Sequence, residues 1–235
     1  MAGSVGTWIS HNIVHLHLAC VPMSVLLASM VTALMLVALP HIWGWGTRYG
    51  ITAAHEAGHA VCALVLTGRL PRVSLKHDTS GETWWRYRRE SQQLVVAMAG
   101  YPAPALLGLL GAAALVSGNY QAWLYLLLGL ACVETVLLVR NVFGWLVMLA
   151  LVGALWALIQ YDPFGSDVYV ATTTVCVLVL GGLRSCYDAW RHPQAGSDID
   201  VVHRILHLPT SMLGMGLVLV VAAMAGATLV WLAVA

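Results

Sequence analysis

The sequence carries very little charge for its length. Of its 235 residues only 9% are Asp, Glu, Lys or Arg, whereas 60% are hydrophobic, and the mean hydropathy is +0.82. A soluble domain of this size needs a charged surface to remain in solution. The composition therefore excludes an ordinary soluble protein, leaves no room for a sizeable soluble domain, and indicates a membrane protein.

Other features that the sequence lacks narrow the class further. No Lys or Arg precedes Arg48, so the first apolar run has no positive n-region of a cleavable signal peptide, and we expect a transmembrane helix there. The five cysteines include no C-x-x-C pair and lie mostly in apolar runs, which argues against a disulfide framework. Fixed-period repeats and low-complexity linkers are absent too, so we expect residues 1–235 to form one domain.

Long apolar runs fill most of the chain. About 20 apolar residues cross a hydrocarbon core of roughly 30 Å as a helix. The runs predict an all-α membrane protein with six or seven transmembrane helices. The candidate spans are 18–39, 45–67, 93–117, 121–139, 143–160, 167–184 and 209–234.

The basic residues are distributed unevenly between the two sides of these predicted spans. With seven spans, ten of the eleven Lys and Arg residues fall on one side and only Arg48 on the other. Lys and Arg are retained on the cytoplasmic side of the spans that they flank. We therefore expect a multi-pass protein of the cell membrane with a cytoplasmic N-terminus and with the acidic loop 161–167 outside.

Three titratable side chains interrupt the apolar stretch ITAAHEAGHAVCALVLTG at 51–68. His55 and His59 are four residues apart, which on a helix places both imidazoles on one face, close enough to bind one Zn²⁺. Glu56 follows the first of them and can act as the general base for a zinc-activated water, as in other H-E-x-x-H sites. Because ionisable groups at membrane depth are costly, a purely structural role for all three is the less favoured interpretation.

The stretch RVSLKHDTSGETWWRY at 72–87 predicts a short membrane-associated β-hairpin after this helix. DTSG supplies the turn, with Gly81 free to adopt positive φ. An edge strand beside a zinc site can hold a substrate segment extended. The alternative, a solvated loop whose Trp84 and Trp85 rest at the membrane interface, is compatible with the same residues.

HEAGHAV on a predicted transmembrane helix, the Gly-containing hairpin and the small-residue run AGYPAPALLGLLG at 99–111 together resemble the site-2 protease family of intramembrane zinc metalloproteases. The likeness is closest to its compact bacterial members without a PDZ domain. It implies a bacterial plasma membrane, a Zn²⁺ cofactor, and substrates that are transmembrane segments of other proteins, cut within the lipid bilayer near its cytosolic face. No nucleic-acid partner is expected.

The third zinc ligand departs from that resemblance. The family's usual ligand is an aspartate in an Asn-Pro…Asp-Gly segment, which this chain lacks. RNVFG at 140–144 is similar to a remnant of it and implies that Asn141 binds the substrate backbone; Gly81 in the hairpin is the other substrate-binding candidate. AGSDIDVVHRI at 195–205 resembles the ligand-bearing helix start of compact members and, more distantly, of membrane-anchored AAA-type zinc proteases, with Asp198 as the match. Asp200 and Glu134 remain alternatives.

Two functions from other classes also fit a metal site in such a membrane protein. One is a non-catalytic zinc-binding scaffold or chaperone, and the other is a metal transporter with histidines as transit ligands. Neither needs a base next to the first ligand, whereas hydrolysis does. Glu56 therefore favours the metalloendopeptidase.

Overall fold

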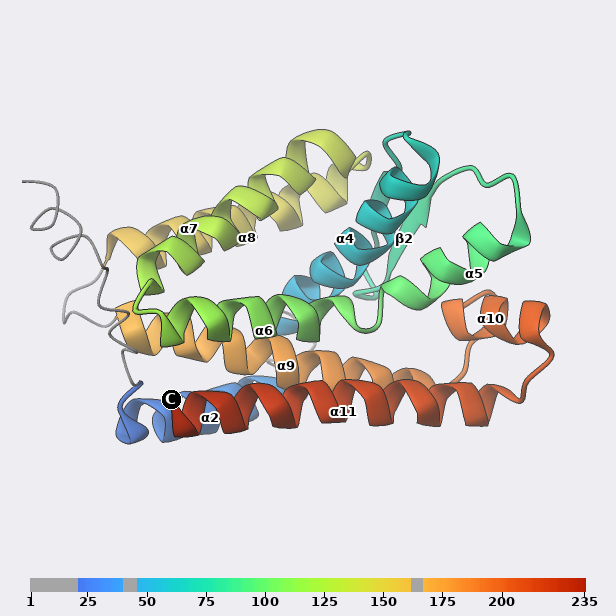
Figure 1. The fold of residues 1–235 in the computed structure, drawn as a ribbon. Helices are drawn as coiled ribbons and strands as arrows, with labels where there is room; N and C mark the ends of the chain where they lie inside the picture. Colours follow the sequence, from blue (N-terminus) through green and yellow to red (C-terminus); the bar gives the residue numbers. More distant parts are fainter. Residues whose placement is uncertain (1–20, 40–45, 162–166) are drawn as a thin grey trace, which may run out of the picture.

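The computed structural model describes residues 21–39, 46–161 and 167–235, and this part of the chain is predominantly helical (Figure 1). Each predicted span coincides with a helix or with a pair of consecutive helices. Parts of the first two predicted spans (18–20 and 45) and most of the predicted acidic loop (162–166) lie outside the described residues. The elements are α2 Met23–Ala38, α4 Arg48–Thr67, β1 Arg72–Leu75, β2 Gly81–Trp84, α5 Glu90–Ala99, α6 Ala103–Val116, α7 Tyr120–Val133, the π-helical turn η2 Glu134–Leu138, α8 Val142–Gln160, α9 Asp167–Arg191, α10 Asp198–Leu206 and α11 Thr210–Val234.

Four of the described helical segments are long and apolar enough to cross a membrane. They are α7 with η2, α8, α9 and α11. The pair α5 and α6, bent by 54° at its break, makes a fifth if it is one span, and α2 is an apolar helix of 16 residues. A helical membrane protein with a small antiparallel sheet is thus confirmed, while the number of six or seven spans stays a prediction.

Helix α9 lies at the centre of the bundle. It packs against α2, α6 and α11, and its Val175, Cys176 and Val179 are fully buried. Figure 1 shows α7 and α8 as an antiparallel pair on one side, with α4 and the hairpin beside them and α10 at one end. The polar residues of α4 therefore sit inside the bundle, at the level where the hairpin, α5 and α10 converge.

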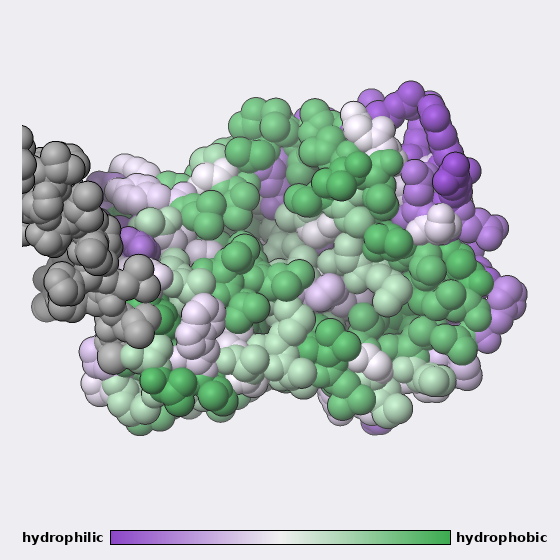
Figure 2. Space-filling model, viewed as in Figure 1, coloured by the Kyte–Doolittle hydropathy of each residue, from purple (hydrophilic) through white to green (hydrophobic). Residues whose placement is uncertain are grey.

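The surface of the molecule is divided by polarity. Figure 2 shows a mostly hydrophobic flank and a hydrophilic end that coincides with the hairpin and the segment leading into α5. Large apolar side chains such as Leu146 on α8 and Leu219 on α11 are exposed, as expected for residues that face lipid.

The hairpin forms where DTSG predicts it, but the positive φ of its turn falls on Thr79 (66°) and not on Gly81, which is the first residue of β2. The two edges of the hairpin differ. β1 pairs with β2 in antiparallel register, with Arg72 opposite Trp84 and Leu75 opposite Gly81. On its other edge, β1 is covered by the segment before α8: Arg140 N–H donates to the Val73 carbonyl over 2.9 Å, and Val139 forms a bridge with Val73. Within the described part of the chain, β2 is therefore the free edge of the sheet.

The predicted continuous span 93–117 is divided in two. The chain breaks between Ala99 and Ala103, where Pro102 has no N–H to continue the helical ladder. The break brings this segment very close to α4, since a Cβ on Gly58 would lie 2.5 Å from the Ala103 Cβ. A glycine at position 58 is thus what permits α6 to approach the helix that bears His55 and His59.

Candidate metal centre

Two imidazoles of α4 meet on one face of the helix. The Nε2 atoms of His55 and His59 are 3.0 Å apart, and the rings lie edge to face with centroids 4.6 Å apart. The Tyr101 ring packs against His55 at a centroid distance of 4.8 Å. The four-residue spacing thus produces the local geometry that a shared ion requires.

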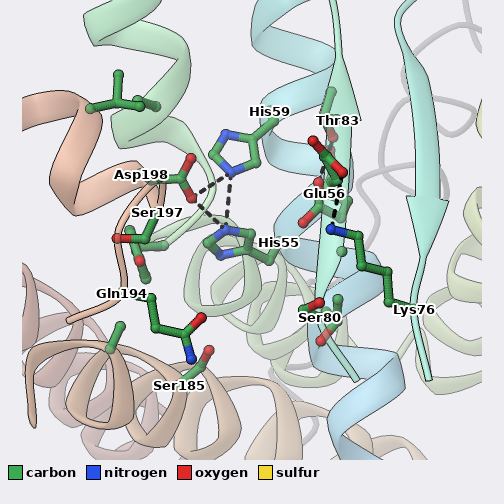
Figure 3. Close-up of a pocket in the computed structure, with 18 of the residues that line it drawn as sticks. His55, Glu56, His59, Lys76, Ser80, Thr83, Ser185, Gln194, Ser197 and Asp198 are labelled. Atoms are coloured by element: carbon green, nitrogen blue, oxygen red, sulfur yellow. Dashed lines mark hydrogen bonds and ion pairs between the residues drawn. The ribbon is translucent and has the colours of Figure 1, made fainter. Parts of the chain in front are cut away.

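Asp198 reaches the same point from the other end of the chain. Its Oδ2 is 3.1 Å from His55 Nε2 and 3.0 Å from His59 Nε2 (Figure 3). Asp198 is the first residue of α10, and Ser197 caps that helix by accepting a hydrogen bond from the Asp200 N–H. Burial raises the pKa of the Asp198 carboxyl, but hydrogen bonds from the two histidines hold it below its usual range, so the group is an anion.

A backbone carbonyl fixes the orientation of His59. Its Nδ1 lies 2.7 Å from the Val96 carbonyl oxygen, which can only accept a hydrogen bond, so Nδ1 carries the proton. Loss of the Nε2 proton, as when a metal binds, then leaves the lone pair on the atom that faces His55 and Asp198. This is the arrangement by which proteins orient a metal-ligating histidine.

The three side chains fit a zinc ion. His55, His59 and Asp198 can each offer one ligand atom, and these atoms all lie within 4.8 Å of one another. Tetrahedral zinc with bonds of about 2.0–2.1 Å separates its ligand atoms by roughly 3.3 Å, close to the spacings observed here. Gly100 leaves the necessary space, since a Cβ at that position would lie against the Nε2 atoms of both histidines.

Glu56 lies next to this group and faces the hairpin. Thr83 Oγ1 donates a hydrogen bond of 2.5 Å to its Oε2, and the carboxylate is buried with only 4% of the residue exposed. Gly81 is equally close, because a Cβ there would lie 2.5 Å from Glu56 Oε1. Gly81 and Thr83 are two apart on β2 and so face the same side. Sequence reasoning did not identify Thr83, although strand alternation from Gly81 points to it.

All of these groups line one polar cavity of about 820 Å³. One wall is formed by α4 and the hairpin, with the exposed ion pair of Lys76 and Glu82 (3.0 Å), and the opposite wall by the end of α9 and the loop before α10. Ser185, Asp188 and His192 contribute polar side chains to that opposite wall. Water can therefore reach the three possible ligands and Glu56 inside an otherwise apolar bundle.

The remaining ligand and substrate-binding candidates, Asn141, Asp200 and Glu134, lie outside the cavity. The Asn141 amide group is bonded to the backbone of Leu75 on β1, as donor over 2.6 Å and as acceptor over 3.1 Å. Asp200 accepts a hydrogen bond from the Gly196 N–H over 2.8 Å and lies 3.6 Å from Arg204. Glu134 is buried at the start of η2, and its Oε1 has no hydrogen-bond partner among the described residues.

Comparison with known proteins gives the family of this chain. A family model described as Peptidase M50B-like matches residues 27–229, a range that includes α4, the hairpin and α10. The chain belongs to the Peptidase M50B-like family. The match confirms the resemblance to site-2 proteases, which are membrane metalloproteases. No curated protein and no solved structure matches the chain.

The family also accounts for the chemistry of the donor set. Peptidases of the M50 type are zinc enzymes, and two imidazoles with one carboxylate are a common ligand set of catalytic zinc. Three protein ligands leave the fourth position of a tetrahedral site to water. The polar cavity beside His55, His59 and Asp198 would give water access to such a position.

Proposed function

We propose that this M50B-like protein is an intramembrane zinc endopeptidase that hydrolyses peptide bonds in the transmembrane segments of other membrane proteins. The observation that carries the proposal is the meeting of His55, His59 and Asp198 with Glu56 in one polar cavity of an apolar helical bundle. A scaffold or a metal transporter has no use for the buried carboxylate beside the ligands.

In this proposal His55, His59 and Asp198 hold the zinc ion. When bound, zinc supplies a Lewis acid that lowers the pKa of a water molecule and polarises a carbonyl group. The Val96 carbonyl keeps His59 in the tautomer that binds metal, and Tyr101 supports the ring of His55. These contacts orient the ligands before the metal arrives.

Glu56 is the proton carrier. It accepts a proton from the attacking water and delivers it to the nitrogen of the departing amine, so one carboxylate serves as base and then as acid. Thr83 holds one of its oxygens by hydrogen bonding to Oε2. The second oxygen remains available to the water, and the missing side chain of Gly81 leaves the space that the carboxylate occupies.

The free edge of β2 positions the substrate. The backbone N–H and C=O groups of Val73 and Leu75 point away from β2, toward residues 139–141. In an antiparallel pair, the residues opposite them, Thr83 and Gly81, then point their backbone groups away from β1, to the outer edge of β2. An extended substrate segment that pairs with this edge lies beside Glu56. Asn141 contributes by fixing β1 through Leu75, and the hydrophilic end of the molecule faces the cytosol in this proposal.

Replacing Glu56 by glutamine tests the function. Glu56→Gln keeps the shape of the side chain but cannot accept the proton, so the rate of cleavage of a transmembrane peptide in proteoliposomes should fall about 10²- to 10⁴-fold. Zinc content, measured by elemental analysis, should be unchanged. Glu82→Gln, which alters an exposed carboxylate on the same cavity wall, is the matched control and should stay active.

The outcomes separate the proposed enzyme from the alternatives. Full activity of zinc-loaded Glu56→Gln protein would remove Glu56 from the mechanism. A wild-type protein that binds zinc stoichiometrically but cleaves no member of a broad panel of transmembrane peptides would favour the scaffold, and zinc flux across the vesicle membrane would favour the transporter.

A further inference from the structure

A second cavity meets the metal centre from the lipid-facing side. It is an apolar groove of about 260 Å³ between α5, α10 and α11. Its inner end is formed by Ala97, Tyr101 and Asp198, the three residues that also line the polar cavity. From there the groove runs along α11 past residues such as Met212, Gly216 and Val220. We call it the α5–α11 groove.

We propose that the α5–α11 groove is the subsite for one large apolar side chain of the substrate, next to the scissile bond. This inference rests on the proposed function and adds to it a rule of substrate selection. A transmembrane segment carries mainly apolar side chains, and the groove is an apolar cavity that reaches one of the three possible metal ligands, Asp198.

The size of the groove suits a single bulky side chain. An apolar cavity of about 150 Å³ is sufficient to bind a benzene molecule. The groove, at about 260 Å³, therefore has room for an aromatic ring or a branched aliphatic chain, but not for an intact helix, which is about 10 Å in diameter. Because the side chain arrives from lipid, which is as apolar as the groove, its binding is favoured by van der Waals packing against the groove walls and not by transfer from water.

The two cavities differ in the part of the substrate that they can accept. The polar cavity presents Lys76, Glu82 and Asp188 and is suited to water and to the polar backbone of an unwound segment. The groove is bounded mainly by apolar side chains, among them Met212 and Val220 of α11, which are more than half exposed. A segment that arrives from the lipid can thus place its backbone at the metal and its side chain in the groove.

Two glycines on α11 allow a matched test. A Cβ on Gly216 or on Gly226 would meet no atom within 4 Å, so a side chain introduced at either position begins in open space. Gly216 lines the groove, whereas Gly226 lies ten residues, or about 15 Å of helix, further along. Gly216→Leu therefore fills the groove, and Gly226→Leu makes the same chemical change away from it.

The substrates should be synthetic transmembrane peptides that differ at a single residue, Ala, Leu or Phe, at each of the four positions that flank the cut. For the wild-type protein, one position should show a kcat/KM for Phe or Leu at least about 10-fold above that for Ala, the range that apolar pockets provide. Gly216→Leu should reduce this ratio to near 1 while zinc content stays the same, and Gly226→Leu should retain it. Identical ratios in the two variants would overturn the proposal.

Binding can be measured independently of cleavage. A transmembrane peptide with a photoreactive phenylalanine at the selected position should crosslink to Met212 or Leu217 in Glu56→Gln protein, and Gly216→Leu in the same background should abolish this product. If the wild-type protein cleaves peptides but this crosslink is absent, the subsite assignment is wrong and the proposed function stands. If a photoreactive phospholipid labels the groove and the peptide does not, the groove is a lipid site and the proposal is overturned.

Discussion

Helices α4 and α10 contribute to the metal centre in different ways. α4 has 20 residues, is packed by the hairpin, α5, α6 and α9, and presents His59 and Glu56 almost fully buried. α10 has nine residues, docks on α5 and α11 through the buried Ile199 and Val202, and begins at the cavity wall. The Asp198 side chain is 30% exposed, against 6% for that of His59.

This difference indicates which part of the centre is the weaker one. The spacing of His55 and His59 is fixed within one helix, so it persists as long as α4 is folded. The distance from Asp198 to the histidines depends instead on the docking of a short helix by two buried side chains, each contributing roughly 1.5–3 kcal/mol. A metal ion shared by both helices would add its binding free energy to that docking.

The largest expected effect comes from removing the contribution of α10. Asp198→Ala leaves two histidines on α4, and a catalytic zinc site needs three protein ligands, so the purified variant should lose most of its zinc and its activity. Zinc content by elemental analysis and a chelator competition titration measure this loss.

Asp200→Ala and Glu134→Gln are the controls for this prediction. Asp200 is engaged with Gly196 and Arg204, and Glu134 lies outside the cavity, so both variants should keep their zinc. A zinc-replete Asp198→Ala beside a zinc-free Asp200→Ala or Glu134→Gln would transfer the ligand to the residue whose loss removed the metal.

A smaller effect is expected from occupying the space between the ligands. The added methyl group of Gly100→Ala would lie 2.6 Å from His55 Nε2, so either the imidazoles or the backbone must move. Changes to residues that orient metal ligands lower metal affinity roughly 10- to 100-fold, and we expect Gly100→Ala to lower zinc affinity by at least this factor. Gly50→Ala, on α4 with open space at its Cβ, should bind zinc normally. Unchanged affinity in Gly100→Ala would mean that the break before α6 moves freely.

The smallest expected effect is a change in local stability when zinc is removed. Amide hydrogen exchange of α10 should become faster after treatment with a chelator, because only its docking on α5 and α11 then holds it, while exchange in the middle of α4 should stay slow. Mass spectrometry of peptides covering 195–207 and 50–65 compares the two regions in one sample. Equal acceleration in both peptides would contradict the difference between the helices.

Much of the fold is local enough to be predicted from the sequence. Apolar runs gave the positions of the helices, and the DTSG turn gave the hairpin between β1 and β2, because both patterns act over a few residues. The bend at 100–102 is the exception within a predicted span. The apolar composition of the span continues across the break, so the sequence does not show the bend. Only the packing of Ala103 against Gly58 shows how closely α6 approaches α4.

The sequence by itself determined the pair of imidazoles and the carboxylate of Glu56, since their spacing is a property of a single helical turn. Tertiary structure alone decided that Asp198, 139 residues after His59, lies 3.0 Å from it, that Thr83 holds Glu56, and that Asn141 is bonded to β1. It also decided that an apolar groove ends at Asp198. The physical reason is that no local periodicity encodes the distance between α4 and α10, two helices far apart in the sequence that both pack against α5.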